Sequence, residues 1–161
     1  MNFVLIGYGK MGRTIEALGT KQGDSFPLII DESNREELSA HSLHGIDAAI
    51  EFTLPEAAPE NIRKCVDLGL PVVCGTTGWN QKIPEIESYC RAHKGSLFHA
   101  SNFSIGVNIL FSLNKKLARI MDQFPQYKVH IHEAHHVHKK DAPSGTAISL
   151  AQQILEASST L

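Results

Sequence analysis

The sequence of 161 residues lacks the features that mark a disulfide-stapled or membrane-embedded protein. Its three cysteines are odd in number and widely spaced, which predicts neither a disulfide framework nor a zinc pattern. No apolar run is long enough to cross a bilayer, and no basic-then-apolar leader with a small-residue cleavage site is visible. We therefore expect a cytoplasmic protein with no membrane partner, in which Cys65 and Cys74 pack as core residues.

An excess of charge of either sign is also lacking. The net charge is −2 with neutral histidines and the pI is about 6.5, so nothing electrostatic favours nucleic acid or an anionic membrane as a partner. Hydrophobic residues make up 42% and charged residues 20%, which is ordinary for a globular protein and argues against disorder. The sequence has no internal repeat and no low-complexity segment.

What the sequence does contain is an alternation of short apolar runs with amphipathic helical patterns. The apolar runs predict five strands, and the patterns between them predict three helices. The expected strands are Asn2–Ile6, Phe26–Ile30, Asp47–Phe52, Pro71–Cys74 and Ser96–His99, and the expected helices are Lys10–Gly19, Pro55–Leu68 and Pro84–His93. Strands that alternate with helices imply an α/β fold, with a parallel sheet and helices on both faces. Such sheets bind ligands at the carboxyl ends of their strands.

The pattern changes after Asn102. A long helix is expected over Ile105–Met121, then a strand over Tyr127–Ala134, a histidine-rich loop, and a helix from about Ser144. We place a domain boundary near residue 104, which gives a first domain over 1–104 and an incomplete α+β domain over 105–161. The second domain is too short to bury a good core alone, so we expect it to pack on the first domain, on a partner subunit or on further chain.

A glycine loop follows the first expected strand and opens the first expected helix. It fits G-x-G-x-x-G in the required context: the first glycine permits a tight turn, the second lets a pyrophosphate approach the backbone, and the third lets helix and strand pack closely. The helix N-terminus adds N–H donors for phosphates. The alternative is a turn that only joins strand to helix. The loop favours a Rossmann-like dinucleotide-binding domain, with Gly7, Tyr8, Gly9, Lys10, Met11 and Gly12 as cofactor-binding residues.

An acidic residue at the end of the second expected strand supports this assignment. Asp31 lies about 20 residues past the glycine loop, where a carboxylate accepts hydrogen bonds from a ribose. A carboxylate there favours NADH, because it repels a 2′-phosphate, but the nearby Arg35 could offset that repulsion. We therefore expect NADH or NADPH without choosing between them.

Two further loops follow expected strands. Glu51-Phe52-Thr53 and Gly75-Thr76-Thr77-Gly78 bring small and hydroxyl-bearing residues to the edge where ligands bind. Their carbonyls and threonine hydroxyls could hold a nicotinamide carboxamide. Ordinary turn chemistry is the alternative, and the position at strand carboxyl ends favours cofactor contact.

The segment from Glu133 to Thr146 is dense in polar and basic residues, and three interpretations compete. His130, His132, His136 and His138 lie on one face of an extended strand and could bind zinc, although no obvious carboxylate or second shell supports it. They could instead be surface residues. The catalytic interpretation, which we favour, makes a histidine the proton donor, while a lysine and the helix start at Pro143-Ser144-Gly145-Thr146 bind a carboxylate. We expect no metal.

Taken with the glycine loop, four stretches resemble the dihydrodipicolinate reductase family. They are EAHHVHKKDAPSGTA, EFTLPE, VVCGTTGW and ASNFSIGVN, so the resemblance runs from Asn2 to about Ala151. It implies NAD(P)H-dependent reduction of a cyclic, imine-type dicarboxylate to tetrahydrodipicolinate in lysine and diaminopimelate biosynthesis. It also implies a homo-oligomer, which is a tetramer in the family.

The resemblance assigns roles to residues. It makes His135 the acid that protonates the ring carbon after hydride transfer, and Lys139 the second catalytic residue. His136, Ser144, Gly145 and Thr146 match positions that hold the substrate carboxylates. Gly7 to Gly12 and Asp31 match the adenine side of the cofactor site. The nicotinamide side is matched by Gly75, Thr76, Thr77, Ala100, Ser101, Asn102 and Phe103.

The sequence departs from the family at two places that matter here. Glu51 stands where the family has an acid shorter by one carbon, and family members continue well past Leu161 to complete the sheet of the substrate domain. Two other functions stay open. One is a non-catalytic nucleotide-binding module, and the other is a related oxidoreductase on a small carboxylate, such as aspartate dehydrogenase.

Overall fold

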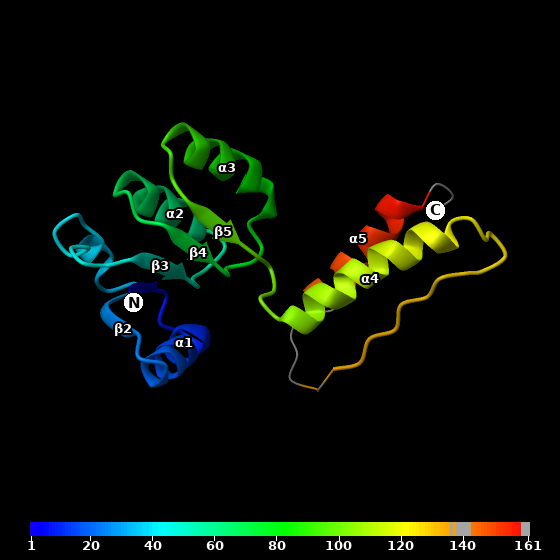
Figure 1. Ribbon diagram of the computed structural model, residues 1–161, viewed down its shortest axis with the longest axis horizontal. Helices are drawn as coiled ribbons and strands as arrows, with labels where there is room; N and C mark the ends of the chain where they lie inside the picture. The colour runs from blue at the N-terminus through cyan, green and yellow to red at the C-terminus, as the bar shows by residue number, and fades with distance from the viewer. Residues whose placement is uncertain (136, 138–142, 159–161) are drawn as a thin grey trace. The chain divides into compact units, whose positions relative to one another are not determined.

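The computed structural model describes residues 1–135, 137 and 143–158 (Figure 1). The chain divides into two compact units, Met1–Ser101 and Asn102–Leu161. Among the described residues, no helix combines the length and the apolarity that a membrane span needs. Each unit is built around its own elements and is described in turn.

The first unit contains a sheet of five parallel strands, which confirms the predicted α/β class. In chain order the strands are β1 (Asn2–Ile6), β2 (Ser25–Ile30), β3 (Ala48–Glu51), β4 (Val72–Cys74) and β5 (Leu97–His99). Their order across the sheet is β2-β1-β3-β4-β5. The chain therefore steps outward from β1 to β2 and then returns to the other side of β1. This reversal separates the loops that follow β1 and β3, and ligands of open parallel sheets bind at such a point.

Three helices connect these strands and cover both faces of the sheet, as expected. They are α1 (Lys10–Lys21), α2 (Ala58–Asp67) and α3 (Ile83–Ala92). Crossovers between parallel strands are right-handed, and the crossover through α1 runs in the opposite direction from those through α2 and α3. Consequently α1 covers one face while α2 and α3 cover the other (Figure 1). The core between them includes Val4, Ile6, Ala49, Ile62, Cys65, Val72, Cys74 and Ile86.

The end of α1 differs from the prediction. We expected the helix to end near Gly19, but it continues to Lys21, and Gly23 with a φ of +90° follows it. Gly19 serves packing instead, because a Cβ there would lie 2.6 Å from the ring of Phe26 on β2. The glycine in the helix makes room for an aromatic side chain of the sheet.

The second unit contains two helices that pack against each other, α4 (Ile105–Met121) and α5 (Gly145–Ala157). The predicted bounds of α4 are confirmed at both ends. Ser104 caps α4 by accepting a hydrogen bond from the N–H of Val107 at 3.4 Å. Asn114 joins the two helices by donating from Nδ2 to the backbone oxygen of Leu150 at 3.1 Å.

The predicted strand over Tyr127–Ala134 is wrong. These residues form no ladder with any strand of the part of the chain that the structure describes, and Val129 and Ile131 are exposed. Alternation of apolar and polar residues suits a strand only where a neighbouring strand satisfies the backbone groups, and the described residues of this unit supply none. A cavity of about 520 Å³ lies between this segment and the ends of α4 and α5.

Candidate cofactor and substrate sites

The glycine loop after β1 is held tightly against its surroundings. The N–H of Gly7 donates to the backbone oxygen of Ile30 at 2.8 Å, and Gly7 has a φ of +96°. A Cβ on Gly7 would lie 2.1 Å from the backbone oxygen of Phe52, and a Cβ on Gly12 would lie 2.3 Å from that of Gly7. Both residues therefore have to be glycine for reasons internal to the fold: one for the turn and one for close packing of α1.

Gly9 is different, because no described residue of the first unit packs against it. It is exposed, it is the N-cap of α1, and a Cβ built on it meets no atom within 4 Å. The first-turn N–H groups of a helix have no intrahelical acceptor and carry the positive end of the helix dipole. Open space over this end fits the pyrophosphate of a dinucleotide, which needs a close approach to the backbone.

The three other loop residues lie around this helix start. The hydroxyl of Tyr8 donates to the carboxylate of Glu16, and the guanidinium of Arg13 lies 4.4 Å from the centre of the Tyr8 ring. The hydrogen bond to Glu16 raises the pKa of Tyr8 above its ordinary value. Tyr8 is thus turned along α1, while Lys10 and Met11 are exposed in its first turn.

Asp31 lies immediately after β2 and presents an ordered carboxylate. One of its oxygens accepts hydrogen bonds from the N–H and the hydroxyl of Ser33, at 2.8 and 2.7 Å. These bonds lower the pKa of Asp31, so the group is ionised at neutral pH. Among the described residues no ion pair joins Asp31 to Arg35, which leaves the second carboxylate oxygen available to a ribose.

The loops after β3 and β4 are joined by backbone and side-chain hydrogen bonds. The N–H of Thr53 donates to Oγ1 of Thr76 at 2.7 Å, and the N–H of Gly75 donates to the backbone oxygen of Glu51 at 2.9 Å. A Cβ on Gly75 would lie 2.1 Å from the ring of Phe52. Thr76 is therefore buried and engaged in the fold, whereas Thr77 is exposed at the sheet edge.

A cavity of about 530 Å³ lies beside these two loops. Trp79 is one of its walls and is anchored by a hydrogen bond from Nε1 to the backbone oxygen of Thr76 at 2.7 Å. The ring of Trp79 also meets the ring of His99, with 4.7 Å between their centres. Sequence reasoning gave neither aromatic residue a role, although Trp79 follows the turn after one predicted strand and His99 is the last residue of another. The other residues that line the cavity are Pro55, Glu56, Gly78, Asn80, Gln81 and Lys82.

Sequence reasoning gave no role to the side chain of Glu51, which is fully buried. Its carboxyl group accepts hydrogen bonds from the Thr53 hydroxyl and from Sγ of Cys74, the latter at 3.0 Å. Burial and the negative charge of Glu51 raise the pKa of the Cys65 thiol to about 12, and the same two causes raise the pKa of Cys74. The sequence signal that could have identified this role is an acidic residue at the end of an apolar strand, two residues before a threonine.

Residues 100–103 leave the end of β5 and lead into α4. The N–H of Ala100 donates to the backbone oxygen of Cys74 at 3.3 Å, so it continues the sheet edge. Oδ1 of Asn102 accepts from the N–H of Ser104 at 2.8 Å, which fixes the turn before α4. Ala100 and Ser101 thus belong to the first unit, while Asn102 and Phe103 belong to the second.

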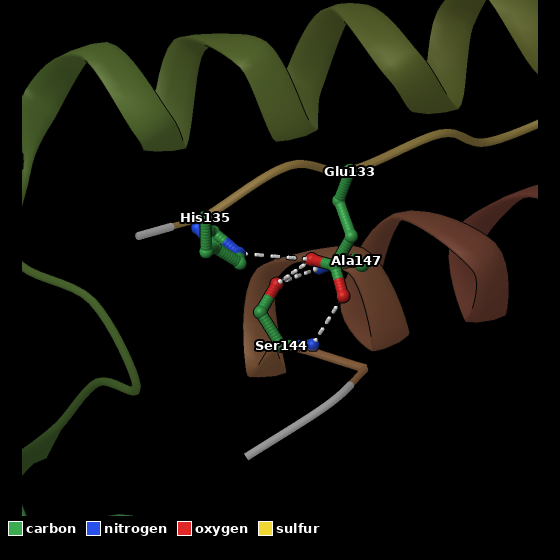
Figure 2. Close-up of polar contacts among 4 residues, drawn as sticks. All are labelled: Glu133, His135, Ser144 and Ala147. Atoms are coloured by element: carbon green, nitrogen blue, oxygen red, sulfur yellow. Dashed lines mark hydrogen bonds and ion pairs between the residues drawn. The ribbon is translucent and has the colours of Figure 1, made fainter. Parts of the chain in front are cut away.

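The start of α5 carries a polar cluster (Figure 2). Glu133 accepts two hydrogen bonds from Ser144, one from its N–H at 2.8 Å and one from its hydroxyl at 2.5 Å. Nε2 of His135 lies 3.1 Å from the same carboxylate, and Oγ of Ser144 accepts from the N–H of Ala147 at 3.1 Å. The bonds from Ser144, with a smaller contribution from His135, lower the pKa of Glu133.

This cluster changes what Ser144 can do at the expected substrate site. Its N–H and hydroxyl are already bound to Glu133, so the donors that α5 offers to a ligand are the first-turn N–H groups of Gly145 and Thr146. The predicted residues His136 and Lys139 lie outside the described residues. The zinc alternative also involves His136 and His138, which the structure does not describe.

Comparison with known proteins gives a consistent result. The family described as "Dihydrodipicolinate reductase, N-terminus" matches residues 1–103, and "Dihydrodipicolinate reductase, C-terminus" matches residues 106–160. A 4-hydroxy-tetrahydrodipicolinate reductase of Christiangramia forsetii is 44% identical over 100% of this chain and 66% of its own length. One of Chromobacterium violaceum is 35% identical over 97% of this chain and 65% of its own length.

A solved structure agrees with these relatives. The dipicolinate-bound dihydrodipicolinate reductase from Paenisporosarcina sp. TG-14 is similar with a TM-score of 0.72 and 27% identity, over 100% of this chain and 68% of that one. The chain thus spans about two thirds of the length of the relatives that match it along nearly all of its residues.

Proposed function

Because this chain belongs to the dihydrodipicolinate reductase family, we propose that it reduces 4-hydroxy-tetrahydrodipicolinate, whose hydroxyl group leaves as water, to tetrahydrodipicolinate with NADH or NADPH. The reaction belongs to lysine and diaminopimelate biosynthesis. The observation that carries the proposal is the open face of Gly9 at the start of α1. The fold does not require a glycine at this position, whereas the close approach of a pyrophosphate to the backbone does.

The first unit is proposed to bind the cofactor along the carboxyl edge of its sheet. The exposed N–H groups at Gly9 receive the pyrophosphate, and the free oxygen of Asp31 accepts a ribose hydroxyl. The residues proposed for the nicotinamide end are Gly75, Thr76 and Thr77, with Ala100, Ser101, Asn102 and Phe103. When bound there, the reduced nicotinamide supplies the hydride.

The second unit is proposed to bind the dicarboxylate and to donate the proton. Gly145 and Thr146 offer first-turn N–H groups of α5 to one carboxylate, while His136 and Lys139 supply positive charge. His135 donates the proton that the ring carbon needs after the hydride arrives. With Nε2 of His135 held 3.1 Å from the Glu133 carboxylate, Nδ1 is the nitrogen left to face a substrate.

Two further properties are proposals of the same kind. A homo-oligomer is supported by the exposed apolar residues of α4, among them Ile109, Leu113 and Leu117, which a partner could cover. A cytoplasmic location is supported by the biosynthetic reductases to which the chain is similar. Cofactor preference is proposed to lean toward NADH, because Asp31 is ionised beside the ribose position.

The test is substrate-dependent oxidation of NADH, followed by its absorbance, in wild type and in His135→Ala and Lys139→Ala. General acid catalysis contributes about 10²–10⁴-fold, so each variant should lose turnover on that scale. His93→Ala is the control. His93 lies between α3 and the amino end of β5, opposite the carboxyl ends of the strands, and it stacks on Tyr89. Calorimetry with dipicolinate should show that His135→Ala still binds a dicarboxylate.

Two outcomes would contradict the proposal. Full turnover in both His135→Ala and Lys139→Ala would contradict the catalytic roles proposed for these two residues. NADH binding by wild type without any turnover would favour a non-catalytic nucleotide-binding module.

A further inference from the structure

Glu51 is a buried carboxyl group that takes no part in the proposed reaction. Its exposed fraction is 0%, and among the described residues no lysine, arginine or histidine forms an ion pair with it. Removing a carboxyl group from water without a cation is costly, and apolar side chains would fill the same space more cheaply. Where a protein keeps such a group, its hydrogen bonds show what it fixes in place.

The hydrogen bonds of Glu51 converge on the two loops of the proposed nicotinamide end. One carboxyl oxygen accepts from the hydroxyl of Thr53 and, at 3.4 Å, from Nδ2 of Asn61 on α2. The other accepts from Sγ of Cys74, the last residue of β4, at 3.0 Å. Asn61 also donates to the Thr53 hydroxyl at 3.3 Å, so this hydroxyl is held from two sides.

The held threonine passes the constraint to the next loop. The N–H of Thr53 donates to Oγ1 of Thr76 at 2.7 Å, and the backbone oxygen of Glu51 accepts from the N–H of Gly75 at 2.9 Å. The turn at Gly75 and Thr76 is therefore attached to Glu51 twice, once by its backbone and once by its side chain through Thr53. None of the side-chain bonds of Glu51 reaches Gly9 or Asp31.

We infer that Glu51 is a positioning residue for the nicotinamide half of the cofactor, because its buried carboxyl group locks Thr53 and, through it, the turn at Gly75 and Thr76. The inference rests on the proposed function, since it takes these loops to receive the nicotinamide. It predicts that a substitution of Glu51 weakens binding of the nicotinamide half of the cofactor and leaves binding of the adenine half unchanged.

Two ligands separate the two ends. NADH occupies both, whereas ADP-ribose has the adenine, the pyrophosphate and both riboses but no nicotinamide. Titration calorimetry on the full chain would measure both in wild type, Glu51→Gln and Glu51→Asp. A lost hydrogen bond corresponds to a change of up to roughly tenfold in a dissociation constant, so Glu51→Gln should weaken NADH by up to about tenfold and ADP-ribose less than about twofold.

Glu51→Asp retains the carboxyl group and should recover most of the NADH affinity. Cys65→Ser is the matched control for general destabilisation. Cys65 is equally buried in α2, yet it takes no part in the hydrogen bonds that join the two loops. It should lower the urea midpoint while leaving the ratio of the two dissociation constants unchanged.

The outcomes are distinguishable. Equal weakening of both ligands in Glu51→Gln, or no weakening of either, would overturn the inference while the proposed function stands. A wild-type chain that binds neither ligand would overturn the proposed cofactor site itself. If Glu51→Gln does not fold, Thr53→Val is the second variant, because valine has the shape of threonine but lacks the hydroxyl that Glu51 binds. Thr53→Val should then weaken NADH and not ADP-ribose, and any other result would overturn the inference.

Discussion

Gly9 and Gly7 belong to one motif, yet alanine at Gly9 should lower cofactor affinity, whereas alanine at Gly7 should lower the stability of the fold. Gly9 has a φ of −79° and a ψ of −156°, which any residue adopts, and its Cβ would meet no atom of the described residues within 4 Å. Gly9→Ala should therefore change the free energy of unfolding by no more than about 0.5 kcal/mol. The added methyl group occupies the space proposed for the pyrophosphate, so NADH affinity should fall at least about tenfold, equivalent to roughly 1.4 kcal/mol.

Gly7→Ala should act on the fold instead. A φ of +96° puts an L-residue in the left-handed region, which costs roughly 1–2 kcal/mol. Its Cβ would also lie 2.1 Å from the backbone oxygen of Phe52, and forcing apart a packed contact costs about 1–3 kcal/mol. The sum is about 2–5 kcal/mol, which is a large share of the 5–15 kcal/mol that stabilises a typical domain.

Urea unfolding followed by circular dichroism, with NADH fluorescence on the same samples, checks both halves of the argument. With a urea m-value of about 2 kcal/mol/M, Gly7→Ala should lower the midpoint by about 1–2.5 M and Gly9→Ala by less than about 0.3 M. Gly9→Ala with wild-type NADH affinity would refute the assignment of the open face to the pyrophosphate. A wild-type midpoint for Gly7→Ala would refute the reasoning from the backbone.

Three other expectations follow from single groups. Asp31→Asn removes the charge that repels a 2′-phosphate, so the ratio of NADPH to NADH affinity should rise about tenfold in calorimetry. The lowered pKa of Glu133 means that its bonds to Ser144 stabilise the start of α5 above the ordinary glutamate pKa. That stabilisation should be lost as the pH falls from there through the folded value, with a smaller hydrogen-exchange protection factor for the N–H of Ser144. Finally, Cys65 and Cys74 should resist iodoacetamide at pH 8 until urea unfolds the chain, because burial raises the pKa of both thiols.

Local signals were sufficient for most of the fold. The helix over Ile105–Met121 was predicted to its last residue, because apolar residues recur along it at helical spacing. The five strands of the sheet were predicted within one residue at each end, because each is a short apolar run. The segment 127–134 failed because alternation identifies which residues can form a strand, whereas the partner that completes it lies elsewhere in space.

The same distinction separates the site residues that could be predicted from those that could not. Gly9 and Asp31 follow from position alone, since each stands where a strand meets its loop. The roles of Glu51 and Glu133 depend on hydrogen bonds to residues 23 and 11 positions away, which no spacing rule reports.

Glu133 shows what this changes. The start of α5 was predicted to bind an anionic ligand. The chain already places a carboxylate there, because Glu133 accepts hydrogen bonds from both the N–H and the hydroxyl of Ser144. A substrate carboxylate is therefore expected to meet Gly145 and Thr146 beside a charge that is already there. Binding then needs additional positive charge, which gives Lys139 and His136 their place in the proposal.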